Sequence, residues 1–288
     1  MTDLTPDLAA RLAAAGLDPA ATAALVRAAL AEDGAVDVTS EPIFGPDDTA
    51  AGDFTAREDG VVAGVPVAAV VLELLGVAYE ARVADGDRVA AGDVLISASG
   101  PTRALLRAER TALNLLTHLS GIATETRRWA DAIEGTGACV RDSRKTLPGL
   151  RALQKYAVRC GGGVNHRMSL ADAALVKDNH VAAAGSVTRA YEAIRAVYPS
   201  LHVQVECDTL DQVAEALAAG ATSILLDNMS VPETAAAVKL VDGRAELEAS
   251  GGLALAGAAD VAATGVDYLA VGALTHSSRA FDIGLDFS

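Results

Sequence analysis

The sequence is poor in cysteine, in aromatic residues and in positive charge. Its three cysteines, Cys139, Cys160 and Cys207, lie far apart without a CxxC pair, so neither a disulfide framework nor a zinc finger is indicated. Aromatic residues make up only 3% of the chain, which favours a polar ligand over an apolar one. The formal net charge of -15 disfavours nucleic acids and anionic membranes as partners, because both require a positive surface.

Long apolar runs and a dinucleotide-binding glycine motif are also missing. No stretch approaches about 20 uncharged apolar residues, and the segment MTDLTPDLAARLAAAG has acids near its start, so we expect a soluble, cytoplasmic protein without a signal peptide. No GxGxxG follows an apolar run, which argues against an open dinucleotide-binding fold. What is present is 51% hydrophobic residues over 288 positions, enough for two domains or one large α/β unit.

The first part of the chain predicts helices around a small sheet. Leucines at helical spacing predict one helix over residues 4–31, and residues 102–134 predict a long helix rich in Leu, Ala and paired charges. Residues 52–99 contain short β-like runs broken by glycines, with an apolar helix near residues 65–75. We therefore expect a small sheet with a helix packed on it.

From Ala138 onward, short apolar runs alternate regularly with helical stretches. Strands are predicted at residues 138–142, 173–177, 202–206, 222–227, 245–249 and 267–271. Helices are predicted between them, for example at residues 186–197, 209–219, 231–241 and 255–264. Repeated strand-then-helix units are typical of a parallel sheet that is closed or nearly closed into a barrel.

Charged residues end four of these predicted strands, the first being Asp142 at the end of ACVRD. ALVK ends on Lys177, HVQVE on Glu206 and SILLD on Asp227. In α/β barrels the carboxyl ends of the strands meet on one rim, where the catalytic groups lie. Magnesium usually takes one or two carboxylates together with substrate phosphates, which suits Glu206 with Asp227. The alternative is a pair of carboxylates that only hydrogen-bond the barrel loops.

Glycine-containing turns follow the last two predicted strands. Ser250 precedes Gly251 and Gly252, and Val271 precedes Gly272. Barrels commonly hold a phosphate on free backbone N–H groups at this position. The motif SGG is weak alone, but its place after the penultimate strand favours a phosphate site.

One segment carries a local charge of opposite sign to the chain. Seven cations oppose only Asp142 there, a local excess of about six positive charges: Arg141, Arg144, Lys145, Arg151, Lys155, Arg159 and Arg167. Such a run is usually one solvated face, but this one contains GGG and Asn-His-Arg. Because guanidinium groups bind carboxylates and phosphates in bidentate fashion, the run predicts a cationic pocket for a small polyanion carrying both groups.

Six blocks occur in order between residues 109 and 277: ERTALNLLTHLSGIAT (109–124), DSRKTLPGLRALQKYAVRCGGGVNHR (142–167), LVKDNH (175–180), LLDNM (225–229), ASGGL (249–253) and GVDYLAVGALTHS (265–277). Together with the early EDGAVDVTS (32–40), they resemble the quinolinate phosphoribosyltransferase family, also called nicotinate-nucleotide pyrophosphorylase (carboxylating). Six blocks in order are far more specific than any one of them.

The resemblance implies an α/β fold with an N-terminal α/β sandwich domain and an incomplete, open TIM-like α/β barrel. The expected bounds are residues 1–115 for the first domain, 116–275 for the barrel and 276–288 for a C-terminal segment that returns to the first domain. It also implies a homodimer with active sites at the subunit interface. The implied reaction joins quinolinate to phosphoribosyl pyrophosphate, giving nicotinate mononucleotide, carbon dioxide and pyrophosphate, in de novo NAD biosynthesis.

Site residues are carried over from the same blocks. The resemblance implies that the quinolinate carboxylates are bound by Arg144, His166, Arg167 and Lys177, with Arg110 from the neighbouring subunit. It places Lys145 and Lys177 toward the pyrophosphate, and Glu206 and Asp227 toward the ribose and Mg²⁺. The 5′-phosphate end is assigned to Ser250, Gly251 and Gly272.

Two positions depart from the pattern of the family. Ser143 stands where a threonine is common and keeps the hydroxyl, and Gln204 stands where an acid is common. Because Gln204 lies two residues before Glu206 on a predicted strand, it shares the face of Glu206 one pleat deeper, and we expect it to point away from the site. For His166, a general acid and a neutral donor to a carboxylate are both open.

Two alternative functions fit the same scaffold. One is a paralogous enzyme, such as a nicotinate phosphoribosyltransferase or the related protein associated with molybdate transport genes. The other is a noncatalytic anion-binding protein, which would tolerate the loss of Glu206 and Asp227.

Overall fold

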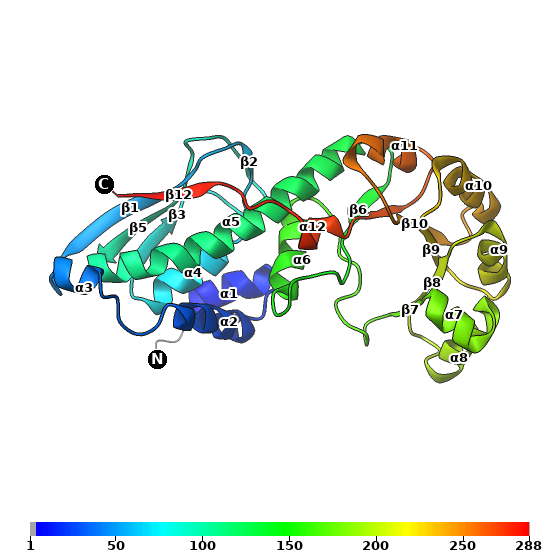
Figure 1. The fold of residues 1–288 in the computed structure, drawn as a ribbon, viewed down its shortest axis with the longest axis horizontal. Helices are drawn as coiled ribbons and strands as arrows, with labels where there is room; N and C mark the ends of the chain where they lie inside the picture. The colour runs from blue at the N-terminus through cyan, green and yellow to red at the C-terminus, as the bar shows by residue number, and fades with distance from the viewer. Residues whose placement is uncertain (1–3, 288) are drawn as a thin grey trace. The chain divides into compact units, whose positions relative to one another are not determined.

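The computed structural model describes residues 4–287. The contacts between residues separate two compact units (Figure 1). The first comprises the residues up to Arg127, Leu147–Gly162 and the residues from Ser277 onward. The second comprises Arg128–Thr146 and Gly163–His276.

The first unit begins with two helices where the leucine spacing predicted one. Helix α1 spans Pro6–Ala14 and α2 spans Pro19–Glu32. The chain breaks at Gly16, whose φ is +74°, and restarts at Asp18, whose Oδ1 accepts a 2.7 Å hydrogen bond from Ala21 N. The prediction of one helix over residues 4–31 is wrong, because a glycine in the left-handed region and an N-cap before a proline outweigh the leucine spacing.

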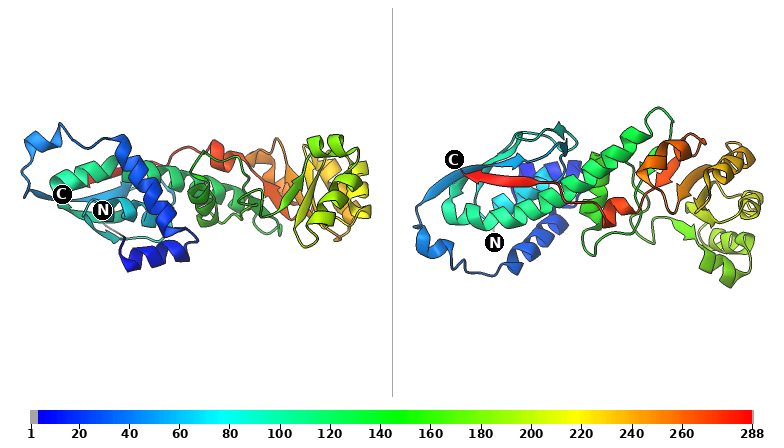
Figure 2. Two further views of the ribbon diagram at one scale, coloured as in Figure 1. Left: turned by 90° about the horizontal axis from the view of Figure 1, so that it is seen from below. Right: turned by 45° about the horizontal axis from the view of Figure 1, so that its top comes forward.

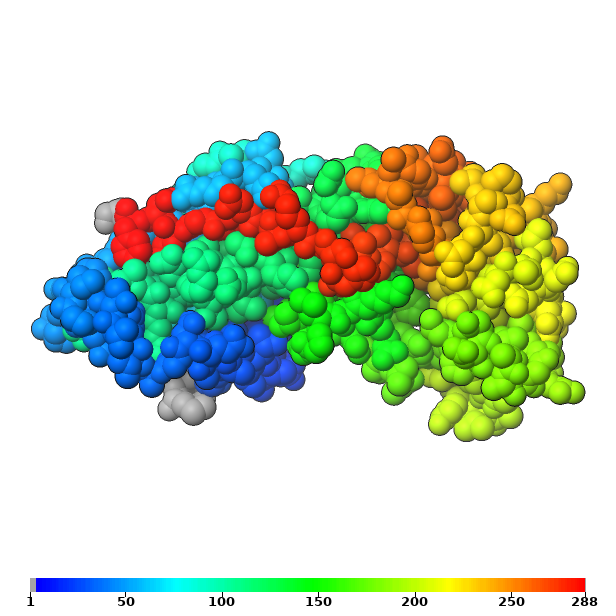
Figure 3. All heavy atoms as spheres, in the orientation of Figure 1, coloured from blue at the N-terminus to red at the C-terminus, as the bar shows by residue number. Residues whose placement is uncertain are grey.

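A four-stranded antiparallel sheet forms the centre of the first unit. Its order is β12-β1-β5-β3, from the strands β12 (Ile283–Phe287), β1 (Thr49–Ala56), β5 (Val94–Pro101) and β3 (Ala78–Ala81). The first unit also contains the short helix α3 (Ser40–Ile43) and a separate pair of strands, β2 (Gly60–Val61) and β4 (Arg88–Val89). The C-terminal strand thus pairs with β1, and Figure 3 shows it on the surface beside α5 (Thr102–Ala132).

Helix α4 (Val65–Leu74) is the apolar helix expected near residues 65–75, and that prediction is confirmed. Every residue from Val65 to Leu72 is buried, as expected for a helix that is apolar all round. Its N-terminus is held by Asp85, whose two carboxylate oxygens accept from Gly64 N and Val65 N at 2.8 and 2.9 Å. Burial raises the pKa of Asp85 above its usual value, against these bonds and one from the Tyr156 hydroxyl.

The long helix predicted over residues 102–134 is confirmed as α5. The division between the two units falls within it, after Arg127, so the expected domain boundary at residue 115 lies inside a continuous helix. Helix α6 (Arg151–Cys160) groups with the first unit, although the sequence placed it in the barrel.

The second unit contains six parallel strands in the order β6-β11-β10-β9-β8-β7. These are β6 (Cys139–Arg141), β7 (Ala174–Val176), β8 (Val203–Cys207), β9 (Ser223–Asp227), β10 (Glu246–Ser250) and β11 (Tyr268–Ala270). Each coincides with a predicted strand to within two residues. Over residues 4–287, β6 and β7 are the two edges of this sheet, so the barrel is open.

Helices lie along the outer side of these strands (Figure 1, Figure 2). They are α7 (Asp178–Ala184), α8 (Val187–Val197), α9 (Leu210–Ala218), α10 (Val231–Val241), the 3₁₀ turn η1 (Leu255–Gly257) and α11 (Ala258–Ala262). The short helix α12 (Ala273–His276) follows the carboxyl end of β11. Capping boxes begin α9, with Thr209 and Gln212, and α10, with Ser230 and Glu233. The predicted α/β fold, with a parallel sheet and a separate small-sheet domain, is confirmed.

The parallel strands are covered on both faces, which explains their continuous apolar runs. In β9, for example, Ser223–Leu226 are buried and only Asp227 at the carboxyl end is partly accessible. The same pattern places the polar strand ends together on one rim. Between residues 4 and 287, no helix combines the length and the apolar character needed to cross a membrane.

Candidate active site

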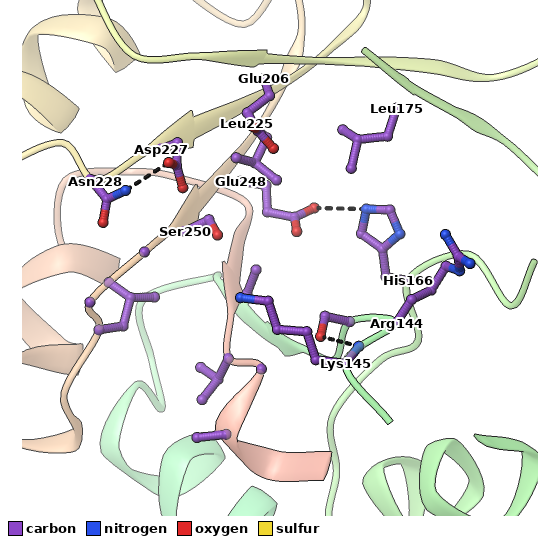
Figure 4. Close-up of a pocket in the computed structure, with 18 of the residues that line it drawn as sticks. Arg144, Lys145, His166, Leu175, Glu206, Leu225, Asp227, Asn228, Glu248 and Ser250 are labelled. Carbon is purple, nitrogen blue, oxygen red and sulfur yellow. Dashed lines mark hydrogen bonds and ion pairs between the residues drawn. The ribbon is translucent and has the colours of Figure 1, made fainter. Parts of the chain in front are cut away.

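A cavity of about 740 Å³ lies within the second unit, at the carboxyl ends of its strands (Figure 4). Its lining brings together ten of the predicted site residues: Arg144, Lys145, His166, Arg167, Lys177, Glu206, Asp227, Ser250, Gly251 and Gly272. Leu175, Leu225 and Leu253 add apolar surface between them. The cavity is thus cationic on one side and acidic on the other.

Asp142 holds the loop that carries two residues of the cationic side. It is fully buried at the end of β6, and its two oxygens accept from Asn165 Nδ2 at 2.6 Å and His166 N at 2.8 Å. Val164 N also bonds Val140 O at 2.8 Å, next to β6. The loop that carries His166 and Arg167 is therefore fixed against the end of β6.

Arg144 and Arg167 present two guanidinium groups to the cavity. Arg167 Nη1 donates to Ala173 O at 2.7 Å, and the buried Arg144 Nε has no hydrogen-bond partner among residues 4–287. Burial lowers the pKa of Arg167, and the positive charge of Arg144 lowers it further. An anion bound between the two guanidinium groups would reduce their repulsion. It would also accept hydrogen bonds from their free N–H groups, as a carboxylate does with arginine.

The main-chain N and O of Lys145 are both hydrogen-bonded by neighbouring hydroxyl groups. Ser143 Oγ accepts from Lys145 N at 3.1 Å, and Thr275 Oγ1 donates to Lys145 O at 2.8 Å. A side-chain carbon at Gly272 would lie 3.0 Å from Lys145 Cδ. Gly272 therefore leaves the space in which the lysine side chain lies, and the hydroxyl of Ser143 holds the turn before it.

The acidic side combines two strand ends. Lys177 Nζ lies 3.4 Å from Glu206 Oε2. Burial raises the pKa of Glu206; Lys177 opposes this, while the negative charge of Asp227 adds to it. Asp227 Oδ2 accepts a 2.7 Å bond from Asn228 Nδ2. The two carboxylates are thus close enough to repel, and a cation between them would be stabilised.

This acidic pair suits a magnesium ion bound together with substrate. The part of the chain that the structure describes contains no group of three or more His, Cys, Asp or Glu side chains able to hold a metal. Magnesium usually takes only one or two carboxylates and completes its shell with water and substrate phosphates. Glu206 and Asp227 therefore fit a metal that arrives with a pyrophosphate.

The turn after β10 packs on Asn228. Gly251 has φ +85° and Gly252 has φ +60°. A side-chain carbon at Gly251 would lie 2.3 Å from Asn228 Oδ1, and Asn228 N bonds Ser250 O at 2.9 Å. Asn228 itself has φ +54°, a conformation that asparagine tolerates better than most residues. Asn228 thus contacts both the glycine turn, through its main-chain N and its close packing on Gly251, and the Asp227 carboxylate, through its side-chain amide.

The structure does not bring the whole cationic run to the cavity. Arg151, Lys155 and Arg159 lie on α6 in the first unit and do not line it, and Lys155 is fully buried. Arg141 turns to Glu248, with a 2.8 Å bond from Nη1 to Oε2, and stacks on Tyr268. The prediction that the seven cations form one pocket is wrong for these four, because helix and strand faces separate neighbours in sequence.

Arg110 is exposed on α5 in the first unit. The cavity is lined by residues of the second unit alone, so Arg110 is not among them. Its role across a subunit interface stays a prediction.

Glu248, Asn228 and His276 line the cavity but were not among the predicted site residues. Glu248 lies inside β10, is 1% exposed and lines the cavity, and Asn228 lies one residue past β9. An acid within an apolar strand, as in ELEAS, was the available signal for Glu248. Gln204 lies one pleat deeper than Glu206, as predicted, but the expectation that it points away from the site is wrong, because its Oε1 lies 2.8 Å from His166 Nε2.

Family comparisons extend over both units. Residues 37–120 match the model for the N-terminal domain of quinolinate phosphoribosyl transferase, and residues 122–286 match the model for its C-terminal domain. The chain belongs to the quinolinate phosphoribosyl transferase family. The resemblance found in the six sequence blocks is therefore confirmed.

Named relatives agree with this membership. The nicotinate-nucleotide pyrophosphorylase [carboxylating] of Mycobacterium leprae is 54% identical over 270 residues, covering 91% of this chain and 95% of that protein. The probable enzyme of the same name from Bacillus subtilis is 40% identical and covers 88% of both chains. The solved nicotinate-nucleotide pyrophosphorylase from Francisella tularensis has a TM-score of 0.90 at 36% identity, covering 93% of this chain and 96% of that one.

Proposed function

We propose that this family member is a quinolinate phosphoribosyltransferase, which converts quinolinate and phosphoribosyl pyrophosphate to nicotinate mononucleotide, carbon dioxide and pyrophosphate in de novo NAD biosynthesis. The observation that carries the proposal is the division of one cavity into a side with Arg144, Lys145 and Arg167 and a side with Glu206 and Asp227. A pyridine dicarboxylate fits the first side and a ribose pyrophosphate fits both. The names of the relatives support the same reaction.

The dicarboxylate would lie against the two arginines. Arg144 and Arg167 repel one another and have guanidinium donors to offer, so two ring carboxylates satisfy both. His166 lines the same cavity, and so does Lys177, whose Nζ lies 3.4 Å from Glu206 Oε2. Nicotinate, with one carboxylate, would leave part of this positive charge uncompensated.

The first chemical step needs no protein nucleophile. The lone pair of the pyridine nitrogen attacks the anomeric carbon, and the bond from that carbon to pyrophosphate breaks with its electron pair leaving on oxygen. Positive charge builds on the ribose and negative charge on pyrophosphate. Glu206 and Asp227 stabilise the first, Lys145 and Lys177 stabilise the second, and the turn at Ser250, Gly251 and Gly272 would hold the 5′-phosphate.

Decarboxylation follows from the positive ring nitrogen. The bond between the ring and the adjacent carboxylate breaks, carbon dioxide leaves, and its electron pair stays on the ring carbon next to the cationic nitrogen. This pair then forms a C–H bond with a proton from solvent. Glu206 and Asp227 would hold the magnesium ion, which supplies positive charge to the pyrophosphate oxygens when bound.

Turnover by the purified protein tests the proposal. Quinolinate and nicotinate are offered separately with phosphoribosyl pyrophosphate and magnesium, and pyrophosphate and carbon dioxide are followed. We expect both products with quinolinate alone, and none after chelation of magnesium. Pyrophosphate with nicotinate alone would indicate a paralogous nicotinate enzyme, and no turnover by folded protein would indicate an anion-binding protein. A Glu206→Ala, Asp227→Ala double variant that stayed active would refute the carboxylate roles.

A shared site in a homodimer is part of the proposal. The exposed Arg110 would reach the quinolinate carboxylates of the neighbouring subunit. Mixing an Arg110→Ala variant with a Lys177→Ala variant should restore part of the activity in hybrid dimers, because one site then keeps both residues. Hybrids shown to form but without activity would contradict the geometry. We also propose a cytoplasmic location, where the substrates of NAD biosynthesis would be met.

A further inference from the structure

A buried polar network lies behind the cationic side of the cavity. It joins Arg141 on β6, Glu248 on β10, Gln204 on β8 and His166 in the loop after α6. Glu248 Oε2 accepts from Arg141 Nη1 at 2.8 Å and from Gln204 Nε2 at 2.9 Å, and Gln204 Oε1 lies 2.8 Å from His166 Nε2. Gln204 is 2% exposed and Glu248 1% exposed. Figure 4 shows Glu248 and His166 pointing toward one another.

The chemistry of this network determines where the His166 proton lies. A carboxylate only accepts hydrogen bonds, so the Gln204 atom that faces Glu248 must be the amide nitrogen. The amide oxygen then faces His166 and also only accepts, so His166 Nε2 must carry the proton. From the other side of the ring, His166 Nδ1 accepts from Arg167 N at 2.7 Å, which requires Nδ1 to be unprotonated. The two independent contacts agree on the same tautomer.

Both ring nitrogens of His166 therefore have a hydrogen-bond partner within the protein. The ring links the buried Gln204 to the main chain of Arg167, whose guanidinium group lines the cavity. The charged groups around the ring are Glu248, 3.9 Å from Nε2, then Arg141 behind Glu248, Asp142 on the His166 main chain, and Arg167 with Arg144. Glu248 Oε1 has no partner within residues 4–287, so all contacts of Glu248 in this network pass through Oε2.

We propose that Gln204 is a positioning residue that holds His166 with its proton on Nε2, so that the His166 ring fixes the main chain of Arg167 beside the cavity. Naming the ligand of Arg167 as a pyridine dicarboxylate rests on the proposed function. The tautomer and the network do not.

The direct test is nitrogen NMR of the free protein labelled with ¹⁵N-histidine. The chain has five histidines, and the signal absent from a His166→Asn variant identifies His166. We expect its proton on Nε2, with Nδ1 unprotonated. A proton on Nδ1, or signals averaged between two tautomers, would overturn the proposal whatever the substrate of the enzyme. This measurement needs no folded Gln204 variant and no activity.

Two substitutions then separate positioning from packing. Gln204→Met keeps the length of the side chain but removes both hydrogen bonds, so the His166 signals should average and the KM for quinolinate should rise about tenfold, equivalent to about 1.4 kcal/mol. The KM for phosphoribosyl pyrophosphate should stay within about twofold, because Glu206 and Asp227 are not in the network. Gln204→Glu keeps an acceptor toward Nε2 but turns a second carboxylate oxygen toward Glu248, so it should retain the Nε2 proton of His166 while lowering the free energy of unfolding.

The outcomes are distinguishable from failure of the proposed function. If the wild-type protein does not use quinolinate but shows the Nε2 proton, the tautomer assignment stands and the substrate is wrong. If quinolinate is used and Gln204→Met leaves both the His166 signals and the KM unchanged, the positioning role is refuted. His166 signals that average in Gln204→Glu as they do in Gln204→Met would also refute it, since the acceptor at position 204 would then not hold the tautomer.

Discussion

The pair Gly251 and Gly252 offers a controlled perturbation of the candidate site. Both have positive φ, +85° and +60°, so alanine is strained at either position. They differ in their surroundings. A side-chain carbon at Gly251 would lie 2.3 Å from Asn228 Oδ1 and 2.9 Å from Asn228 N, whereas at Gly252 the nearest atom is Asn228 Oδ1 at 3.9 Å. Gly252→Ala is thus a matched control for Gly251→Ala.

The expected free energies follow from these contacts. Each alanine costs about 1–2 kcal/mol for its left-handed backbone. Gly251→Ala must also displace Asn228, which breaks the 2.7 Å bond from Asn228 Nδ2 to Asp227 Oδ2. A hydrogen bond to a charged group contributes about 1.5–3 kcal/mol. The free energy of unfolding should therefore fall about 1.5–3 kcal/mol further in Gly251→Ala than in Gly252→Ala.

Urea unfolding measures this difference, and steady-state kinetics measures its consequence for the site. Because Asn228 positions both Asp227 and the turn assigned to the 5′-phosphate, Gly251→Ala should raise the KM for phosphoribosyl pyrophosphate and lower kcat. The control should change the KM for phosphoribosyl pyrophosphate much less. Two variants equal in stability within about 0.5 kcal/mol, and equal in KM, would refute the idea that Asn228 couples the turn to the carboxylate.

Further predictions concern Glu206 and a close helix contact. Burial raises the pKa of Glu206, so its ionisation destabilises the folded state above that pKa and has no effect once the pH falls below the unfolded value of about 4.3. Glu206→Gln should therefore raise Tm at about pH 8 while abolishing turnover, with the gain vanishing near pH 4; a gain independent of pH would contradict this. Gly121→Ala would gain about 1 kcal/mol from helix propensity alone, but its side-chain carbon would lie 2.0 Å from Arg279 O. Calorimetry should show a lower Tm. A higher Tm would show that the main chain at Arg279 can shift away from position 121 without a cost in stability.

The local sequence pattern was sufficient to predict an element wherever burial of apolar side chains alone determines its structure. The six parallel strands were predictable because strands buried on both faces must be apolar throughout and must end in polar residues. Helices α4 and α5 were predictable for similar reasons. The first helix was mispredicted because the φ of Gly16 depends on the αL turn that follows α1, which competes with leucine spacing.

The sequence by itself determined the fold class, the family and ten residues of one rim, because the strand ends and the six blocks that resemble the family each consist of consecutive residues. The tertiary structure decided which of the seven cations reach the cavity and which atoms they face. It also decided the direction of Gln204, whose partners His166 and Glu248 lie 38 and 44 positions away in the chain. Hydrogen bonds form only within about 3 Å, and such distances between strands that are not neighbours in the sheet arise only when the barrel is assembled.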